Sequence, residues 1–380
     1  MTEHTRAGFN PEYIKKLRDP QRSFLEKAVG VKFAKEFLFK KGNHLFIVGN
    51  TGSGKTQKGY FVIDWLKHTE NQIWISTAKS KEILPLLCMG KKVRIIIPKG
   101  AEFGLEEHTE GGWGPLQDPP EIIEVEYARE AWDAIHPPEY DQSRHKLHNW
   151  INIFEFRDTI TERKGVRSQW MIELFESLAI RTRSGSMPPI FPCSIYLDEA
   201  QWLLAGARIT KDGDRIKNSS IVIENVLEMR SAGCRFVMFA QSYKNIPPAI
   251  RENMLNTILC RGARVEGEEN ESLSYHCRLK PGPSGYDPSQ GKFIHADGTS
   301  FPAVSPWYFP LYPMDEDDRR WIKKIRLNYG RKHGEENPQK EPEEECFPEL
   351  GRFSAMAIKP EEQEPTINRW QSEGVSTDGL

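Results

Sequence analysis

The sequence has no apolar run long enough to cross a bilayer, and this absence is the first constraint on its function. A transmembrane helix needs about 18 or more consecutive apolar residues. The polar segment Met1–Pro20 also lacks the apolar centre of a signal peptide. We therefore expect a cytoplasmic protein without a membrane span of its own, which only a partner could bring to a membrane.

Clustered cysteines and a strong net charge are also missing. The six cysteines, at positions 88, 193, 234, 260, 277 and 346, are scattered and form no C-x-x-C pair. This pattern favours reduced thiols over a zinc site or a disulfide framework. The formal net charge is only −2, but residues 331–380 contain 12 acidic and 6 basic residues. We expect this Glu- and Pro-rich tail to be disordered. It could dock a protein partner, or it could equally be a passive solubilising tail.

The sequence does contain a phosphate-binding loop. Eight consecutive residues fit the pattern G-x-x-x-x-G-K-[ST], namely Gly49, Asn50, Thr51, Gly52, Ser53, Gly54, Lys55 and Thr56. An apolar run at 45–48 precedes them and a helical pattern follows, which is the strand–loop–helix setting that phosphate binding requires. Lys55 would reach the β- and γ-phosphates, and the Thr56 hydroxyl would bind Mg²⁺. The loop therefore predicts binding of Mg²⁺ and ATP.

Two further strand patterns end in residues suited to ATP chemistry. The apolar run Ser194–Leu197 is followed by Asp198 and Glu199. Asp198 would support the Mg²⁺ ion, and Glu199 would orient and deprotonate the attacking water. The run at 236–240 ends in Gln241. If its strand lies between the loop strand and the Asp-Glu strand, Gln241 can contact both the γ-phosphate and the water.

Strand and helix patterns alternate along the chain, which indicates the α/β class. We expect a RecA-like P-loop NTPase core, a mostly parallel sheet sandwiched by helices. The predicted organisation is an N-terminal helical segment 1–43, an ATPase domain 44–330 with an insertion at 100–148, and the tail 331–380. Arg22–Lys40 is predicted to be one amphipathic helix that packs on the sheet, and the helix with apolar residues from Val166 to Leu178 is predicted to face the core.

An arginine pair marks the end of the helix predicted at Ser220–Arg230. Gly233 is a plausible helix C-cap, and Arg230 and Arg235 flank it. Arg230 could act on the γ-phosphate of a neighbouring subunit as an arginine finger, or could simply compensate the helix C-terminus. Compensation is the favoured interpretation for Arg235. Arg261 and Arg264 are weaker finger candidates.

The ordered motifs resemble those of the FtsK–HerA superfamily of hexameric DNA-pumping ATPases. The set consists of the loop, the strand ending in Asp198-Glu199, and an Arg-x-x-Gly turn at Arg230–Gly233 leading into the Gln241 strand. The resemblance covers roughly residues 40–310. The superfamily includes conjugative coupling proteins and viral genome-packaging motors. It implies a homo-hexameric ring with nucleotide at the subunit interfaces and DNA in a central channel.

A DNA-translocating ring needs a loop that contacts phosphates without reading bases. The best candidate lies at 205–217, with four basic residues: Arg208, Lys211, Arg215 and Lys217. Asp212 and Asp214 weaken this interpretation, and the same segment could be a solvated surface loop. Tyr243–Asn245 is a second, weaker candidate.

Two other functional classes stay open. Asp198–Gln201 has the look of a DEAD/DEAH helicase box, but such enzymes need a second RecA-like lobe for which too little chain remains. A nucleotide-dependent switch or assembly ATPase that recruits protein partners is the other alternative, although a water-activating Glu199 is not needed for binding alone. The favoured expectation is an ATP-driven DNA translocase.

Overall fold

The computed structural model describes residues 18–67, 69–76, 80–90, 92–135, 150–156, 166–184, 192–204, 213–260, 263, 290–295 and 308–329. The chain divides into two units, Met1–Pro338 and Gln339–Leu380. All described residues belong to the first unit. The expected acidic tail lies outside the described residues.

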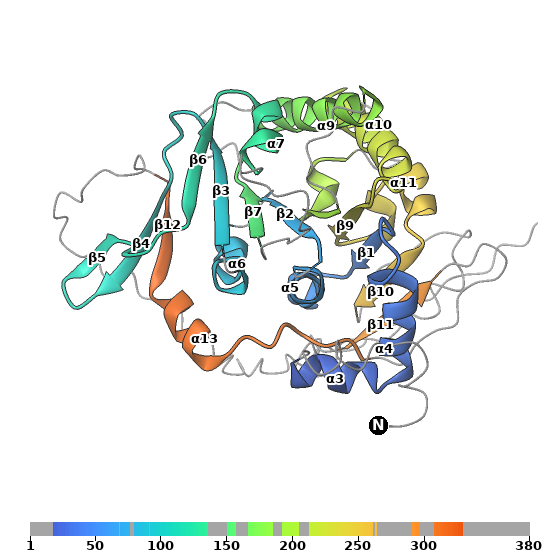
Figure 1. Ribbon diagram of the computed structural model, residues 1–380, viewed down its shortest axis with the longest axis horizontal. Helices are drawn as coiled ribbons and strands as arrows, with labels where there is room; N and C mark the ends of the chain where they lie inside the picture. The colour runs from blue at the N-terminus through green and yellow to red at the C-terminus, as the bar shows by residue number, and fades with distance from the viewer. Residues whose placement is uncertain are drawn as a thin grey trace, which may run out of the picture. The chain divides into compact units, whose positions relative to one another are not determined.

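A nine-stranded sheet forms the centre of the described fold (Figure 1). All of its neighbouring strands pair in parallel except the edge strand β11, which is antiparallel to β10. Across the sheet the strands are β11 (Gly291–His295), β10 (Asn256–Cys260), β1 (Leu45–Val48), β9 (Cys234–Ala240), β8 (Cys193–Leu197), β2 (Asn71–Ile75), β7 (Trp150–Phe154), β3 (Lys92–Pro98) and β6 (Glu121–Val125). The predicted α/β class is confirmed, as is the position of the Gln241 strand, β9, between β1 and β8.

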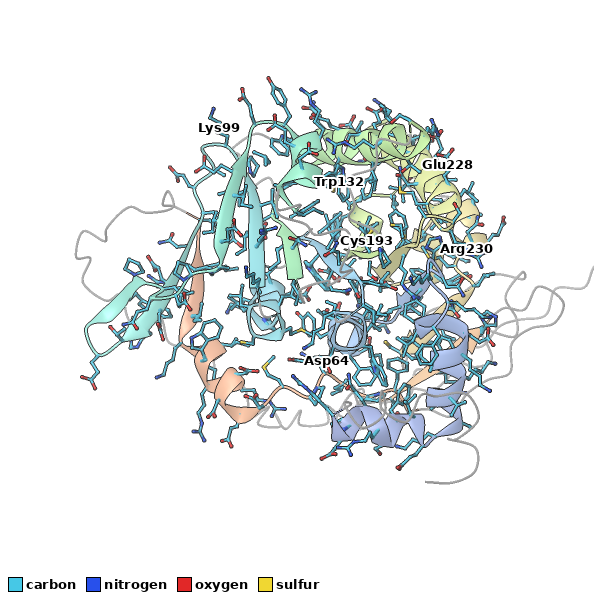
Figure 2. The ribbon with its side chains drawn as sticks, viewed as in Figure 1. Asp64, Lys99, Trp132, Cys193, Glu228 and Arg230 are labelled. Atoms are coloured by element: carbon cyan, nitrogen blue, oxygen red, sulfur yellow. The ribbon has the colours of Figure 1, made fainter. Side chains whose placement is uncertain are left out.

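Helices cover both faces of this sheet (Figure 1). One face carries α3 (Asp19–Leu25), α4 (Ala28–Phe33), the π-helix η1 (Ala34–Leu38), α5 (Lys55–Leu66), the short helix η2 (Ser80–Ile83) and α6 (Leu84–Met89). The other carries η3 (Ala128–Glu130), α7 (Ala131–Ala134), α9 (Val166–Ser184), η4 (Ala200–Trp202), α10 (Gly213–Glu228), η5 (Tyr243–Asn245) and α11 (Pro248–Asn253). Figure 2 shows the same division, with Asp64 of α5 on one side of the sheet and Trp132 of α7 on the other.

Successive residues of β1 explain why two cores form. Leu45 and Ile47 belong to the apolar cluster under α5, whereas Phe46 and Val48 belong to the cluster under α9 and α10. Because side chains alternate across a strand, a parallel strand covered on both faces must be apolar at every position. The apolar stripe of α9 faces this core as predicted, with Leu174 and Leu178 buried.

A small antiparallel sheet lies beside the main one. It consists of β12 (Ile325–Asn328), β4 (Gly104–Thr109) and β5 (Gly112–Pro115), and the helix α13 (Glu316–Lys323) precedes β12. The segment that the sequence set apart at 100–148 thus contributes two strands to this sheet. It also contributes β6, at the strand predicted for 122–125, to the edge of the main sheet.

The single helix predicted for Arg22–Lys40 is wrong, because the chain breaks it into α3, α4 and η1. Lys27 has an extended backbone, with φ −94° and ψ 146°. Gly30 then passes so close to α3 that a Cβ there would lie 1.9 Å from the Phe24 carbonyl oxygen. The predicted packing is nevertheless confirmed, since Phe24 and Phe33 are completely buried against the α5 side of the sheet.

The helix expected to begin at Ser220 begins at Gly213, so the loop predicted at 205–217 ends earlier than expected. The apolar positions of this helix, Ile221, Val222 and Val226, follow Ser220, and Ile216 is the single apolar residue between Gly213 and Ser220, so the sequence shows no helical pattern before Ser220. After Glu228 the chain turns through residues 229–233, and Gly233 at the end of this turn has a left-handed φ of +86°. Because it lies five residues beyond the end of α10, it closes the turn into β9 and is not the predicted C-cap of the helix.

The structure also bears on membrane-spanning helices and on the state of the cysteines. Among the described residues, no helix combines the length and the apolarity that crossing a bilayer requires. The four described cysteines are free; Cys193, Cys234 and Cys260 are buried and Cys88 is half-buried.

Candidate nucleotide site

The phosphate-binding loop connects β1 to α5 at the carboxyl edge of the sheet. Gly52 and Gly54 have φ of +78° and +79°, which L side chains rarely adopt. Gly49 is needed for space, since a Cβ there would lie 2.3 Å from Ser53 Oγ and 2.5 Å from Cys260 Cβ. Gly52 and Gly54 thus supply the left-handed turns of the cradle, and Gly49 supplies the space.

Side chains inside this cradle are suited to an anion. Lys55 is only 5% exposed, and its Nζ lies 3.3 Å from the Asn50 carbonyl oxygen, so the ammonium group is held against the loop. The buried Ser53 hydroxyl has no hydrogen-bond partner. A buried hydroxyl without a partner is costly, and a phosphate oxygen would satisfy it. The loop residues thus fit a nucleoside triphosphate.

The carboxylate pair ends β8 at the same edge. Asp198 and Glu199 are 2% and 1% exposed. Among the described residues Glu199 is the one non-glycine residue with positive φ, at φ 47° and ψ 48°. This conformation costs roughly 1–2 kcal/mol for an L residue, and such strain is characteristic of functional sites.

Gln241 joins the carboxylate pair to the loop. Its Nε2 lies 3.2 Å from Glu199 Oε2. The preceding residue, Ala240, accepts a 3.1 Å hydrogen bond from the Gly49 N–H, which extends the β1–β9 pairing into the loop. Glu199, Gln241 and the start of the loop are therefore contiguous.

The oxygen groups at this edge also fit a magnesium ion. Burial, and then the charges of Glu82 and Asp198, raise the pKa of Tyr60 on α5 well above its ordinary value. The described residues contain no group of three or more His, Cys, Asp or Glu side chains placed to hold a metal by themselves. Mg²⁺ bound to a nucleotide usually takes one or two carboxylates, with phosphates and water as its other ligands. The Thr56 hydroxyl and Asp198 match that requirement.

The two arginines next to Gly233 have different environments. Arg230 is exposed and donates a 2.9 Å hydrogen bond to Asn43 Oδ1, at the amino edge of the sheet, opposite the nucleotide site. Figure 2 shows it at the periphery near Glu228. Arg230 could therefore act only on a nucleotide that is bound to another subunit.

Arg235 is completely buried and pairs with Glu70, its Nε lying 2.7 Å from Glu70 Oε1. It also donates to the carbonyl oxygens of Phe37 and Leu38 at the end of η1. Arg235 thus compensates a helix C-terminus, as favoured, but that of η1 rather than that of the helix before Gly233.

The predicted basic loop is only partly described. Arg208 and Lys211, like Arg261 and Arg264, lie outside the described residues. Arg215 and Lys217 belong to the first turns of α10, so their assignment to a loop is wrong. Lys217 Nζ lies 3.0 Å from Glu176 Oε1 on α9, with both side chains largely exposed.

The sequence analysis gave no role to two residues that contact the site. Gln201 donates to Glu199 Oε2, and Glu82 accepts a 3.2 Å hydrogen bond from the Thr56 hydroxyl. Gln201 was visible as part of the Asp198–Gln201 box. Glu82 had no signal, since it follows β2 in a short helix without a motif.

No protein-family model matches the chain, and no curated protein matches it. Solved structures do. The genome packaging NTPase B204 from Sulfolobus turreted icosahedral virus 2, in complex with AMPPCP, is 9% identical, covers 70% of this chain and 97% of its own, and has a TM-score of 0.38. EssC (ATPases 2 and 3) from Geobacillus thermodenitrificans is 13% identical, covers 74% of this chain and 43% of its own, and has a TM-score of 0.36. The cytoplasmic domain of the type VII secretion ATPase EccC from Thermomonospora curvata is 11% identical, covers 73% of this chain and 24% of its own, and has a TM-score of 0.35.

The fold itself follows from the strand order, with β9 between the loop strand and the carboxylate strand in a parallel sheet covered by helices on both faces. The chain thus has a RecA-like α/β fold with the phosphate-binding loop after β1.

Proposed function

We propose that this protein hydrolyses ATP and uses the energy to move DNA. The observation that carries the hydrolysis is the contact between Glu199 and Gln241 next to the phosphate-binding loop. A binding module would need the loop, but not a strained, buried carboxylate that touches a γ-phosphate sensor. The arrangement supplies a general base, its partner and an anion cradle at one edge of the sheet.

The roles follow from position. The loop residues 49–56 hold the triphosphate, and Lys55 neutralises the β- and γ-phosphates. Thr56 and Asp198 would hold Mg²⁺, which would supply charge neutralisation on the phosphates. Glu199 accepts a proton from the attacking water, and Gln241 orients that water and responds to loss of the γ-phosphate.

The DNA part of the proposal depends on the resemblance to the FtsK–HerA superfamily and on the basic residues before and within α10. Arg208, Lys211, Arg215 and Lys217 would contact phosphates in the channel of a homo-hexamer. Arg230 would act as an arginine finger on the neighbour's nucleotide. Conjugative transfer and genome packaging are both compatible settings.

The test is ATPase activity measured with and without duplex and single-stranded DNA, together with the mass in solution in the presence of ATP. We expect DNA to stimulate hydrolysis and the mass to correspond to a ring. Hydrolysis that no DNA stimulates would favour a nucleotide-dependent switch that recruits protein partners. A DNA-stimulated monomer would favour a DEAD/DEAH-like helicase, although the described residues contain one RecA-like sheet and no second lobe.

A further inference from the structure

A third carboxylate, Glu82, is anchored to the first two turns of α5. Thr56 Oγ1 donates to Glu82 Oε1 at 3.2 Å, and the Tyr60 hydroxyl donates to the Glu82 carbonyl oxygen at 2.5 Å. Thr56 and Tyr60 are four residues apart and so lie on one face of the helix. The two contacts fix both the backbone and the side chain of Glu82 over the nucleotide site.

Glu82 reaches the site from a different segment than the Asp-Glu strand. It belongs to η2, and its contacts with Thr56 and Tyr60 tie it to the helix that begins at the phosphate-binding loop.

The direction of the Thr56 hydrogen bond has a chemical consequence. A hydroxyl has one hydrogen and two lone pairs. A cation can be bound only through a lone pair, so the hydrogen must point elsewhere. Because Glu82 accepts that hydrogen, the lone pairs of Thr56 remain available for a cation, and the nearby negative charge also favours one.

We propose that Glu82 is a positioning residue that couples divalent-cation binding to nucleotide binding by holding the Thr56 hydroxyl in its cation-binding orientation. This inference rests on the proposed function, because it concerns the same nucleotide site. It does not assign Glu82 a step in hydrolysis.

The experiment measures the affinity for a fluorescent ATP analogue in Mg²⁺ and in excess EDTA, for the full chain. We expect Glu82→Ala to weaken binding in Mg²⁺ by about 10- to 100-fold, the effect typical of groups that orient metal ligands, and to change binding in EDTA by less than about twofold. Glu82→Gln keeps an acceptor oxygen and should give an intermediate loss. Glu110→Gln, an exposed carboxylate in the turn between β4 and β5, is the matched control.

A double-mutant cycle with Thr56→Ala distinguishes positioning from general stabilisation. If Glu82 acts through Thr56, the double variant should be no worse than Thr56→Ala alone in Mg²⁺. Equal losses in Mg²⁺ and in EDTA, or additive losses in the cycle, would overturn the inference. If Glu82→Ala does not fold, Glu82→Gln provides the same comparison. If the wild-type chain binds no nucleotide, the proposed function is wrong. If Mg²⁺ raises the nucleotide affinity of both Glu82 variants as much as that of the wild type, only the proposed coupling is wrong.

Discussion

Charged groups are buried at both ends of the parallel strands, the amino edge where the strands begin and the carboxyl edge where they end, but their surroundings differ. At the amino edge, Arg235 and Glu70 form a completely buried pair, and His44 bonds through both ring nitrogens, to the Val226 carbonyl and the Phe236 N–H. At the carboxyl edge, Ser53 has a buried hydroxyl without a partner and Glu199 has a strained backbone. Satisfied polar groups stabilise a fold, whereas unsatisfied and strained ones are kept where a ligand completes them.

The comparison predicts that variants at the two edges fail in different ways. Carboxyl-edge variants should lose activity and keep stability, and amino-edge variants should do the reverse.

Glu199→Gln should lower ATP turnover by roughly 10²- to 10⁴-fold, because an amide cannot accept the proton of the attacking water. Nucleotide affinity and the thermal unfolding midpoint should stay near those of the wild type. Steady-state hydrolysis and calorimetric titration check both parts, with the exposed Glu252→Gln on α11 as control. Normal turnover in Glu199→Gln would remove this residue from the catalytic role.

Arg235→Met should lower the free energy of unfolding by about 3–5 kcal/mol, because Glu70 is left charged and buried without its partner. Urea unfolding measures this loss. The double variant Arg235→Met/Glu70→Leu should recover much of it, since apolar replacement of both partners removes the unpaired charge. If Arg235→Met instead kept its stability and lost activity, the amino edge would have a functional role that its satisfied contacts do not suggest.

The burial of His44 should lower the free energy of unfolding in mild acid. Burial lowers the pKa of His44 from 6.5 to about 4. The unfolded chain therefore binds the proton first, and the stability contributed by neutral His44 is lost as the pH falls from about 6.5 towards 4. Between pH 7 and pH 5 the loss should be about 2 kcal/mol greater in the wild type than in His44→Gln. Urea unfolding at the two pH values measures it, and equal losses would show that His44 titrates normally.

Charge reversal of the basic residues before and within α10 tests the DNA proposal. If the DNA proposal holds, Lys211→Glu and Arg215→Glu should each reduce the salt slope of DNA binding by about 0.9. Lys217→Glu should have less effect, because Lys217 already pairs with Glu176. Fluorescence anisotropy over a salt series tests this, and unchanged slopes would mean that these residues do not contact DNA phosphates.

Local patterns were sufficient for most of the nucleotide site. The loop motif and the apolar runs before Asp198 and Gln241 predicted the three strand ends, and parallel pairing brings such ends to one edge. The break at Lys27 and the early start of α10 were not visible, because each depends on packing between helices rather than on local preference.

The sequence by itself determined the parallel α/β architecture and the phosphate cradle, and it placed Asp198, Glu199 and Gln241 at strand ends, because strand period and motif spacing are local properties of the chain. Only the tertiary structure decided that Arg235 pairs with Glu70, 165 residues away, and that Glu82 holds the Thr56 hydroxyl. Those contacts join side chains from separate elements. Their partners are chosen by how the helices and the sheet pack, and no periodicity in the sequence records that choice.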